Sequence, residues 1–114
     1  MAEKSHLHVL WTTDNPITAE KMVLMYTVNA LAHGWWEKVT LILWGAAATL
    51  VCDHPAVRQK VQAAIAAGVQ VTACKACADQ LGVSETLKEL GIEVTYWSKP
   101  LTEILKNGEP LLTV

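Results

Sequence analysis

The chain of 114 residues lacks phenylalanine, is poor in charged residues and has only three cysteines. Charged residues make up 18% of it, and the nine basic residues are scattered instead of forming a run. Without a basic patch, neither a nucleic-acid partner nor an anionic membrane surface is expected. An odd, small number of cysteines does not suit a disulfide framework, so we expect free thiols and a cytoplasmic location.

Export signals, membrane spans and common nucleotide motifs are also missing. The longest apolar run, over 39–52, is shorter than the roughly 20 residues that a membrane-spanning helix needs. No basic segment followed by an apolar core begins the chain, which predicts that there is no signal peptide. The phosphate-binding motifs GxGxxG and GxxxxGK[ST] do not occur, so we expect no bound cofactor. The hydrolase motif GxSxG does not occur either.

Hydrophobic residues are abundant and amount to 52% of the chain. We expect one domain over 1–114, and a domain of this size buries only about two-thirds of the surface that its unfolded chain exposes. Apolar side chains left over are best covered by copies of the same chain, which predicts a homo-oligomer. Trp35 and Trp36 follow a helix stop and suit such an interface.

Strand-like and helix-like segments alternate along the chain. This order predicts an α/β domain of three layers, with a mostly parallel five-stranded sheet and helices on both faces. Expected strands cover 6–13, 38–44, 69–73, 92–97 and 111–114, and expected helices cover 16–33, 46–51, 55–67, 74–82, 84–90 and 100–106.

Ligands of open α/β sheets bind beyond the carboxyl ends of the strands, near the point where the strand order reverses. Asp14 follows the first expected strand, Trp44 ends the second and Cys74 follows the third. If the strand order were that of flavodoxin, the first and third strands would be neighbours at this point. Cys74 would then lie beside the loop that carries Asp14.

The segment Cys74-Lys75-Ala76-Cys77 is the conspicuous chemical motif of the chain. A cysteine attacks as the thiolate, which a helix N-terminus and a neighbouring positive charge favour. A position at the end of a strand and the start of a helix, next to Lys75, therefore predicts a reactive Cys74. The alternative is an inert thiol that lines the crevice.

Cys77 leaves two further interpretations open. Lying one helical turn after Cys74, it suits a second thiol that forms a disulfide with Cys74, or a residue packed under the helix. A zinc set would need Cys52 and His54 as well. Only one CxxC pair is present and the spacing of Cys52 and His54 is unusual for structural zinc, so we expect no metal.

Several segments of the chain resemble small DsrE-like proteins, most specifically around Cys74. They are Val71-Thr72-Ala73-Cys74-Lys75-Ala76-Cys77-Ala78-Asp79, Leu81-Gly82-Val83, Leu90-Gly91-Ile92-Glu93-Val94, Leu41-Ile42-Leu43-Trp44-Gly45, and the ending from Pro100-Leu101-Thr102-Glu103 to Leu112-Thr113-Val114. The resemblance implies a DsrE/F-like, flavodoxin-related sheet, a trimer or hexamer, and sulfur transfer inside the cell. It also implies that Cys74, which matches the carrier position, holds persulfide sulfur.

We therefore expect a sulfur-relay protein in which Cys74 carries persulfide sulfur and passes it to a thiol of another sulfur-transfer protein. Lys75 would stabilise the anion, and Asp14 or Trp44 would shape the crevice. Two alternatives remain: a dithiol redox or metal-binding module built on Cys74 and Cys77, and a non-enzymatic docking subunit with inert cysteines. The sequence leaves open whether the protein is an enzyme.

Overall fold

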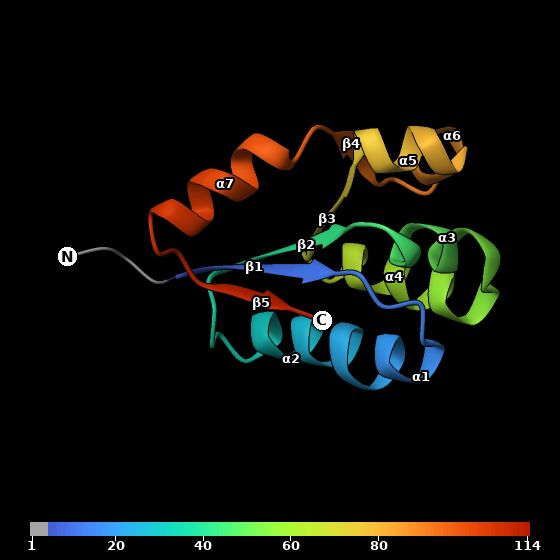
Figure 1. The fold of residues 1–114 in the computed structure, drawn as a ribbon. Helices are drawn as coiled ribbons and strands as arrows, with labels where there is room; N and C mark the ends of the chain where they lie inside the picture. The colour runs from blue at the N-terminus through green and yellow to red at the C-terminus, as the bar shows by residue number, and fades with distance from the viewer. Residues whose placement is uncertain (1–4) are drawn as a thin grey trace.

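The computed structural model describes residues 5–114, which form one five-stranded sheet in which every pair of neighbouring strands is parallel (Figure 1). The predicted fold class is confirmed. The strands are β1 (His6–Trp11), β2 (Lys38–Leu43), β3 (Gln70–Cys74), β4 (Glu93–Thr95) and β5 (Leu111–Thr113). β4 is shorter than the expected 92–97, because the chain leaves the sheet at Tyr96 and turns into a helix at Ser98.

The strands lie in the order β4-β3-β2-β1-β5. A flavodoxin-like order, with the first and third strands adjacent, is therefore wrong: β2 separates them, pairing Leu41 with both Val9 and Val71. The first three crossovers all step in the same direction, and only the last returns past β1 to place β5. The strand order thus reverses between β1 and β5, and Cys74 lies two strands away from β1.

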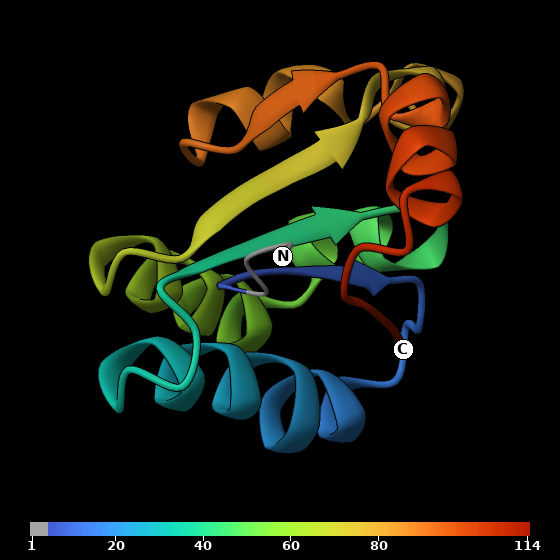
Figure 2. The same ribbon diagram turned by 90° about the vertical axis from the view of Figure 1, so that its left-hand side faces the viewer.

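Right-handed crossovers put helices on both faces of the sheet. Connections that step in one direction share a face, and the returning connection, α7 (Ser98–Lys106), crosses the other face (Figures 1 and 2). The remaining helices are α1 (Pro16–Thr18), the π-helical η1 (Ala19–Leu24), α2 (Met25–Ala32), α3 (Ala46–Asp53), α4 (Pro55–Ala66), α5 (Lys75–Leu81) and α6 (Ser84–Glu89).

Helical structure continues from Pro16 to Ala32, close to the expected 16–33. Asn15 caps its start: the side-chain oxygen accepts a hydrogen bond of 3.0 Å from the Thr18 N–H. Pro16 follows in the first turn, where no backbone donor is needed. This helix end lies just beyond the carboxyl end of β1 and brings the Asp14 loop to the same edge of the sheet.

The two faces of the sheet differ in polarity. One face supplies alternate strand residues to the main apolar core, where Trp11, Leu41 and Leu43 are fully buried against helices from η1 to α6. Beneath α7 the other face carries polar side chains: Thr40 and Thr72 are buried there. No helix within residues 5–114 is long and apolar enough to cross a membrane.

Candidate functional site

A cavity of about 790 Å³ opens at the carboxyl ends of the strands. Asp14, Trp44, Cys74 and Cys77, four of the residues singled out from the sequence, line it together. Trp44 follows β2 and Cys74 ends β3, so neighbouring parallel strands deliver both to one edge. The cavity reaches the Asp14 loop even though β1 and β3 are not adjacent, because it extends across the end of β2.

Cys74 lies at the back of this site. It is the last residue of β3 and the N-terminal cap of α5, and only 2% of its surface is exposed. The backbone of Cys74 is still extended (φ −68°, ψ 118°), and the helix begins at the next residue. The thiol is free, and a reagent can reach it only by way of the cavity that it lines.

Cys77 lies one turn further along α5 and is half-buried. Its Sγ accepts a hydrogen bond of 2.9 Å from the backbone N–H of Gly45. Gly45 has φ 67° and ψ −133°, a combination open essentially to glycine alone, and it forms the N-terminal cap of α3. Sequence reasoning placed Gly45 just after the second strand but did not predict this contact.

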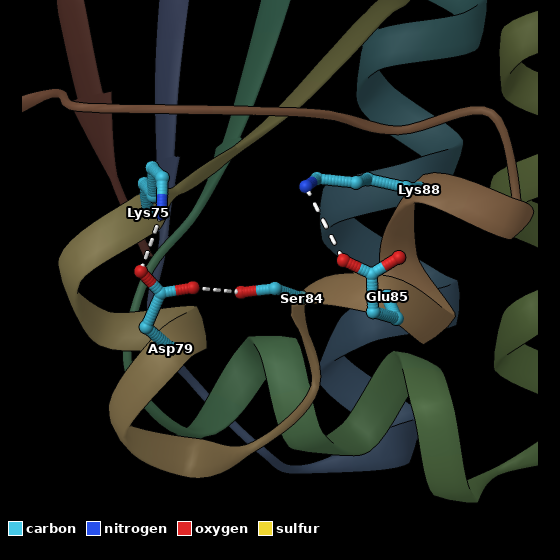
Figure 3. A network of polar contacts seen from close by, with 5 residues as sticks. All are labelled: Lys75, Asp79, Ser84, Glu85 and Lys88. Carbon is cyan, nitrogen blue, oxygen red and sulfur yellow. Dashed lines mark hydrogen bonds and ion pairs between the residues drawn. The ribbon is translucent and has the colours of Figure 1, made fainter.

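Lys75 is placed differently from its expected role. Its ammonium lies 2.6 Å from the Asp79 carboxylate and 5.5 Å from the centre of the Tyr96 ring, and it is absent from the cavity wall. Asp79 also accepts a hydrogen bond from the Ser84 hydroxyl, as Figure 3 shows. The Lys75 and Ser84 hydrogen bonds lower the pKa of the Asp79 carboxyl, and the bond to Asp79 raises that of Lys75.

Further wall residues come from helix faces that sequence reasoning missed. α3 contributes four residues spaced as one helical face, and α5 adds two residues besides its cysteine pair and Ala76. A search for i, i+3, i+4, i+7 spacing after Gly45 would have found the first group. The residues are Ala46, Thr49, Leu50 and Asp53 from α3, and Gln80 and Leu81 from α5.

The third cysteine lies outside the cavity wall. Cys52 is partly buried, and this burial, followed by the neighbouring Asp53 charge, raises the pKa of its thiol. His54 is also engaged elsewhere, because its Nδ1 accepts a hydrogen bond from the Val57 N–H. In residues 5–114 no group of three or more histidine, cysteine or acidic side chains is placed to hold a metal ion.

Comparison with solved structures finds similar chains, among them two that cover nearly the whole of this chain. YchN of E. coli, whose fold is DsrE/F-like, shares 16% sequence identity with a TM-score of 0.69, over 98% of this chain and all of YchN. At that identity YchN shows the fold alone. No family model matches the chain, and no curated protein matches it.

The second relative is much more similar in sequence. It is a conserved protein of unknown function, BT1422 of Bacteroides thetaiotaomicron, with 40% identity and a TM-score of 0.93. The match covers 96% of this chain and 95% of BT1422. An identity of this size over both full chains shows common descent, and the chain therefore belongs to the family of BT1422.

Proposed function

We propose that this protein is a sulfur-relay protein that carries persulfide sulfur on Cys74. The observation that carries the proposal is the cavity of about 790 Å³ whose wall holds two free thiols at the carboxyl ends of the strands. That edge is where α/β sheets bind their ligands. The DsrE/F-like fold of YchN agrees with a sulfur-relay role, as an analogy of fold.

The chemistry is an exchange between sulfur atoms. The Cys74 thiolate attacks the outer sulfur of a donor persulfide, the S–S bond of the donor breaks, and the donor leaves as a thiolate. Cys74 then holds the extra sulfur until an acceptor thiolate attacks it and releases the Cys74 thiolate again. Cys74 is only 2% exposed, so the thiol itself has little contact with bulk water.

Each neighbouring residue has a part in this proposal. Trp44 and Asp14 shape the cavity, and the Gly45 N–H donates a hydrogen bond to the second thiol, Cys77. Lys75 is held by Asp79, which neutralises its charge, so we assign it to the α5 surface. Cys77, whose sulfur already accepts a hydrogen bond, is the nearest second thiol along the chain.

The test is sulfur loading followed by mass spectrometry. The protein is incubated with a persulfide donor, its intact mass is measured, and the modified peptide is identified. We expect the mass of one sulfur atom on the Cys74 peptide, its removal by dithiothreitol, and no loading of Cys74→Ser. Cys52→Ser is the matched control, because Cys52 lies outside the cavity wall and should leave loading unchanged.

A dithiol mechanism is the second candidate, and it is favoured by the Gly45–Cys77 hydrogen bond in the same cavity. In it the Cys77 thiolate attacks Cys74 Sγ of the persulfide, expels hydrosulfide, and leaves a Cys74–Cys77 disulfide. Cys77→Ser would then be as damaging as Cys74→Ser, and the loaded protein would release sulfide. Thiols that fail to react with iodoacetamide near neutral pH would instead favour a docking subunit with inert cysteines.

A further inference from the structure

The cavity around the two thiols carries charge of only one sign. Asp14 and Asp53 are the charged residues of its wall, and both are exposed to solvent. The rest of the wall is neutral, from Trp44 and Leu50 to Ser98. Within residues 5–114, no lysine, arginine or histidine lines this cavity.

Nearby basic groups do not neutralise the cavity. The Lys75 ammonium, which the sequence puts beside Cys74, is bound 2.6 Å from Asp79 and faces the Tyr96 ring. The backbone donor that the structure directs at a sulfur within residues 5–114, the Gly45 N–H, carries no net charge. An anion that enters therefore meets two carboxylates and no formal positive charge.

The two carboxylates of the wall should therefore attract or repel a sulfur donor according to its charge. A wall of one sign raises the local concentration of ions of the opposite sign and repels ions of the same sign, in a way that salt weakens. Anionic donors such as thiosulfate are therefore disfavoured in the cavity that the thiols line. A donor with a positive group next to its sulfur is favoured.

We propose that the cavity selects cationic sulfur donors, chemically persulfides with an amine or guanidinium group close to the reacting sulfur. This inference rests on the proposed function, because it names the substrate class of the same site. Two sources share the chemistry: a small aminothiol persulfide, and a persulfide-bearing protein segment flanked by lysine or arginine. The loading experiments below separate the two.

The primary test uses a pair of reagents that differ in charge. Trimethylammonium-ethyl and sulfonato-ethyl methanethiosulfonate both react with a protein thiolate by the same step, which forms a mixed disulfide and expels methanesulfinate. Both rates come from the same thiolate, so the ratio of the rates does not depend on how much thiolate is present. The ratio of the cationic to the anionic rate is divided by the ratio that the two reagents give with a small free thiol, which corrects for their intrinsic reactivity. Peptide mapping shows which cysteine has reacted.

We expect a normalised ratio on the order of tenfold in favour of the cationic reagent at low salt, decreasing as salt is added. Asp14→Asn and Asp53→Asn should each lower it. Glu37→Gln removes the same charge just before β2, at the opposite edge of the sheet, and should leave it unchanged. A normalised ratio of one in the wild type, or equal effects of all three variants, would overturn the inference.

Loading of Cys74 then distinguishes the sources. The probes are cysteamine persulfide and two persulfide peptides of equal length with either lysine or glutamate on both sides of the cysteine. If cysteamine persulfide loads Cys74 faster than the lysine peptide does, the donor is a small molecule. If the lysine peptide loads Cys74 faster than cysteamine persulfide does, the donor is a protein segment. Equal loading from both peptides and slow loading from cysteamine would contradict the selection. If neither reagent reached a cavity thiol, the proposed function itself would be contradicted.

Discussion

At the scale of single residues, the Gly45 N–H donates the hydrogen bond that Cys77 Sγ accepts. Its backbone, with φ 67° and ψ −133°, is one that a residue with a Cβ adopts only under strain. The added Cβ itself would meet no atom within 4 Å, so a substitution tests the backbone and not the packing. Gly45 thus links a conformational requirement to a functional one.

We therefore expect Gly45→Ala to destabilise the protein by about 1–3 kcal/mol and to slow alkylation of Cys77 by iodoacetamide. Relaxation of the strain would turn the N–H away from the sulfur. Gly108→Ala is the control, because Gly108 also has a positive φ of 64° with free space around it but lies after α7. If Cys77 of the Gly45→Ala protein were alkylated at the wild-type rate, the reactivity of Cys77 would not depend on the Gly45 N–H.

His6 and His8 give a second expectation at this scale. Burial, followed for His6 by the Lys38 charge and for His8 by His6, lowers the pKa of both imidazoles from the ordinary 6.5. His8 is 7% exposed, and its Nδ1 has no hydrogen-bond partner among the residues that the structure describes. Below pH 6.5 the unfolded chain thus binds more protons than the folded one, and stability decreases as the pH falls.

Urea unfolding at several pH values measures this effect. The free energy of unfolding should be constant above the unfolded pKa of 6.5 as far as these groups are concerned, and should decrease as the pH falls below it. His8→Gln should reduce the slope. Parallel curves for the wild type and His8→Gln would show that His8 does not contribute.

At the scale of elements, the capped start of α1 sets the position of the Asp14 loop. Removing the side-chain acceptor in Asn15→Ala should cost about 1 kcal/mol of stability in thermal or urea unfolding, because the Thr18 N–H loses its 3.0 Å partner. Asn29→Ala, an exposed change in the interior of α2, is the comparison. Equal effects of the two changes would mean that the cap does not stabilise this helix start.

The elements themselves were largely predictable, since local patterns determine them. β2 reads as a continuous apolar strand, and α4 shows helical spacing from Pro55 to a glycine stop, so their bounds agree within a residue or two. The π-helical turn η1 was not predictable, because its wide turn leaves no signature in residue types. The order of the strands was not predictable either. Alternation of strands and helices along the chain indicates a parallel sheet, but it does not determine which strands are neighbours.

The site was predictable in part for the same reason. Residues at strand ends, such as Trp44 and Cys74, follow from the sheet alone. The pairing of Lys75 with Asp79 could have been found from the sequence, because residues four apart on a helix are neighbours. That the α3 face with Asp53 and the α5 face with Gln80 line one cavity depends on how the helices pack.

At the scale of the whole molecule, apolar side chains remain on the surface. Ile17, Trp35, Tyr96 and Leu105 are each more than 60% exposed, and Trp35 stacks on His33. Assembly of copies remains our prediction, with a trimer or hexamer as the expected form. Analytical ultracentrifugation should find this species at micromolar concentration, and a monomer at every concentration would contradict it.

The central claim is that Cys74 carries sulfur between proteins, and transfer of a label tests it most directly. The protein is loaded with radioactive sulfane sulfur, freed of donor, and mixed with an acceptor protein thiol. The account predicts that the label leaves the Cys74 peptide, appears on the acceptor in equal amount, and is not transferred by Cys74→Ser. Transfer by a folded Cys74→Ser protein would contradict the account.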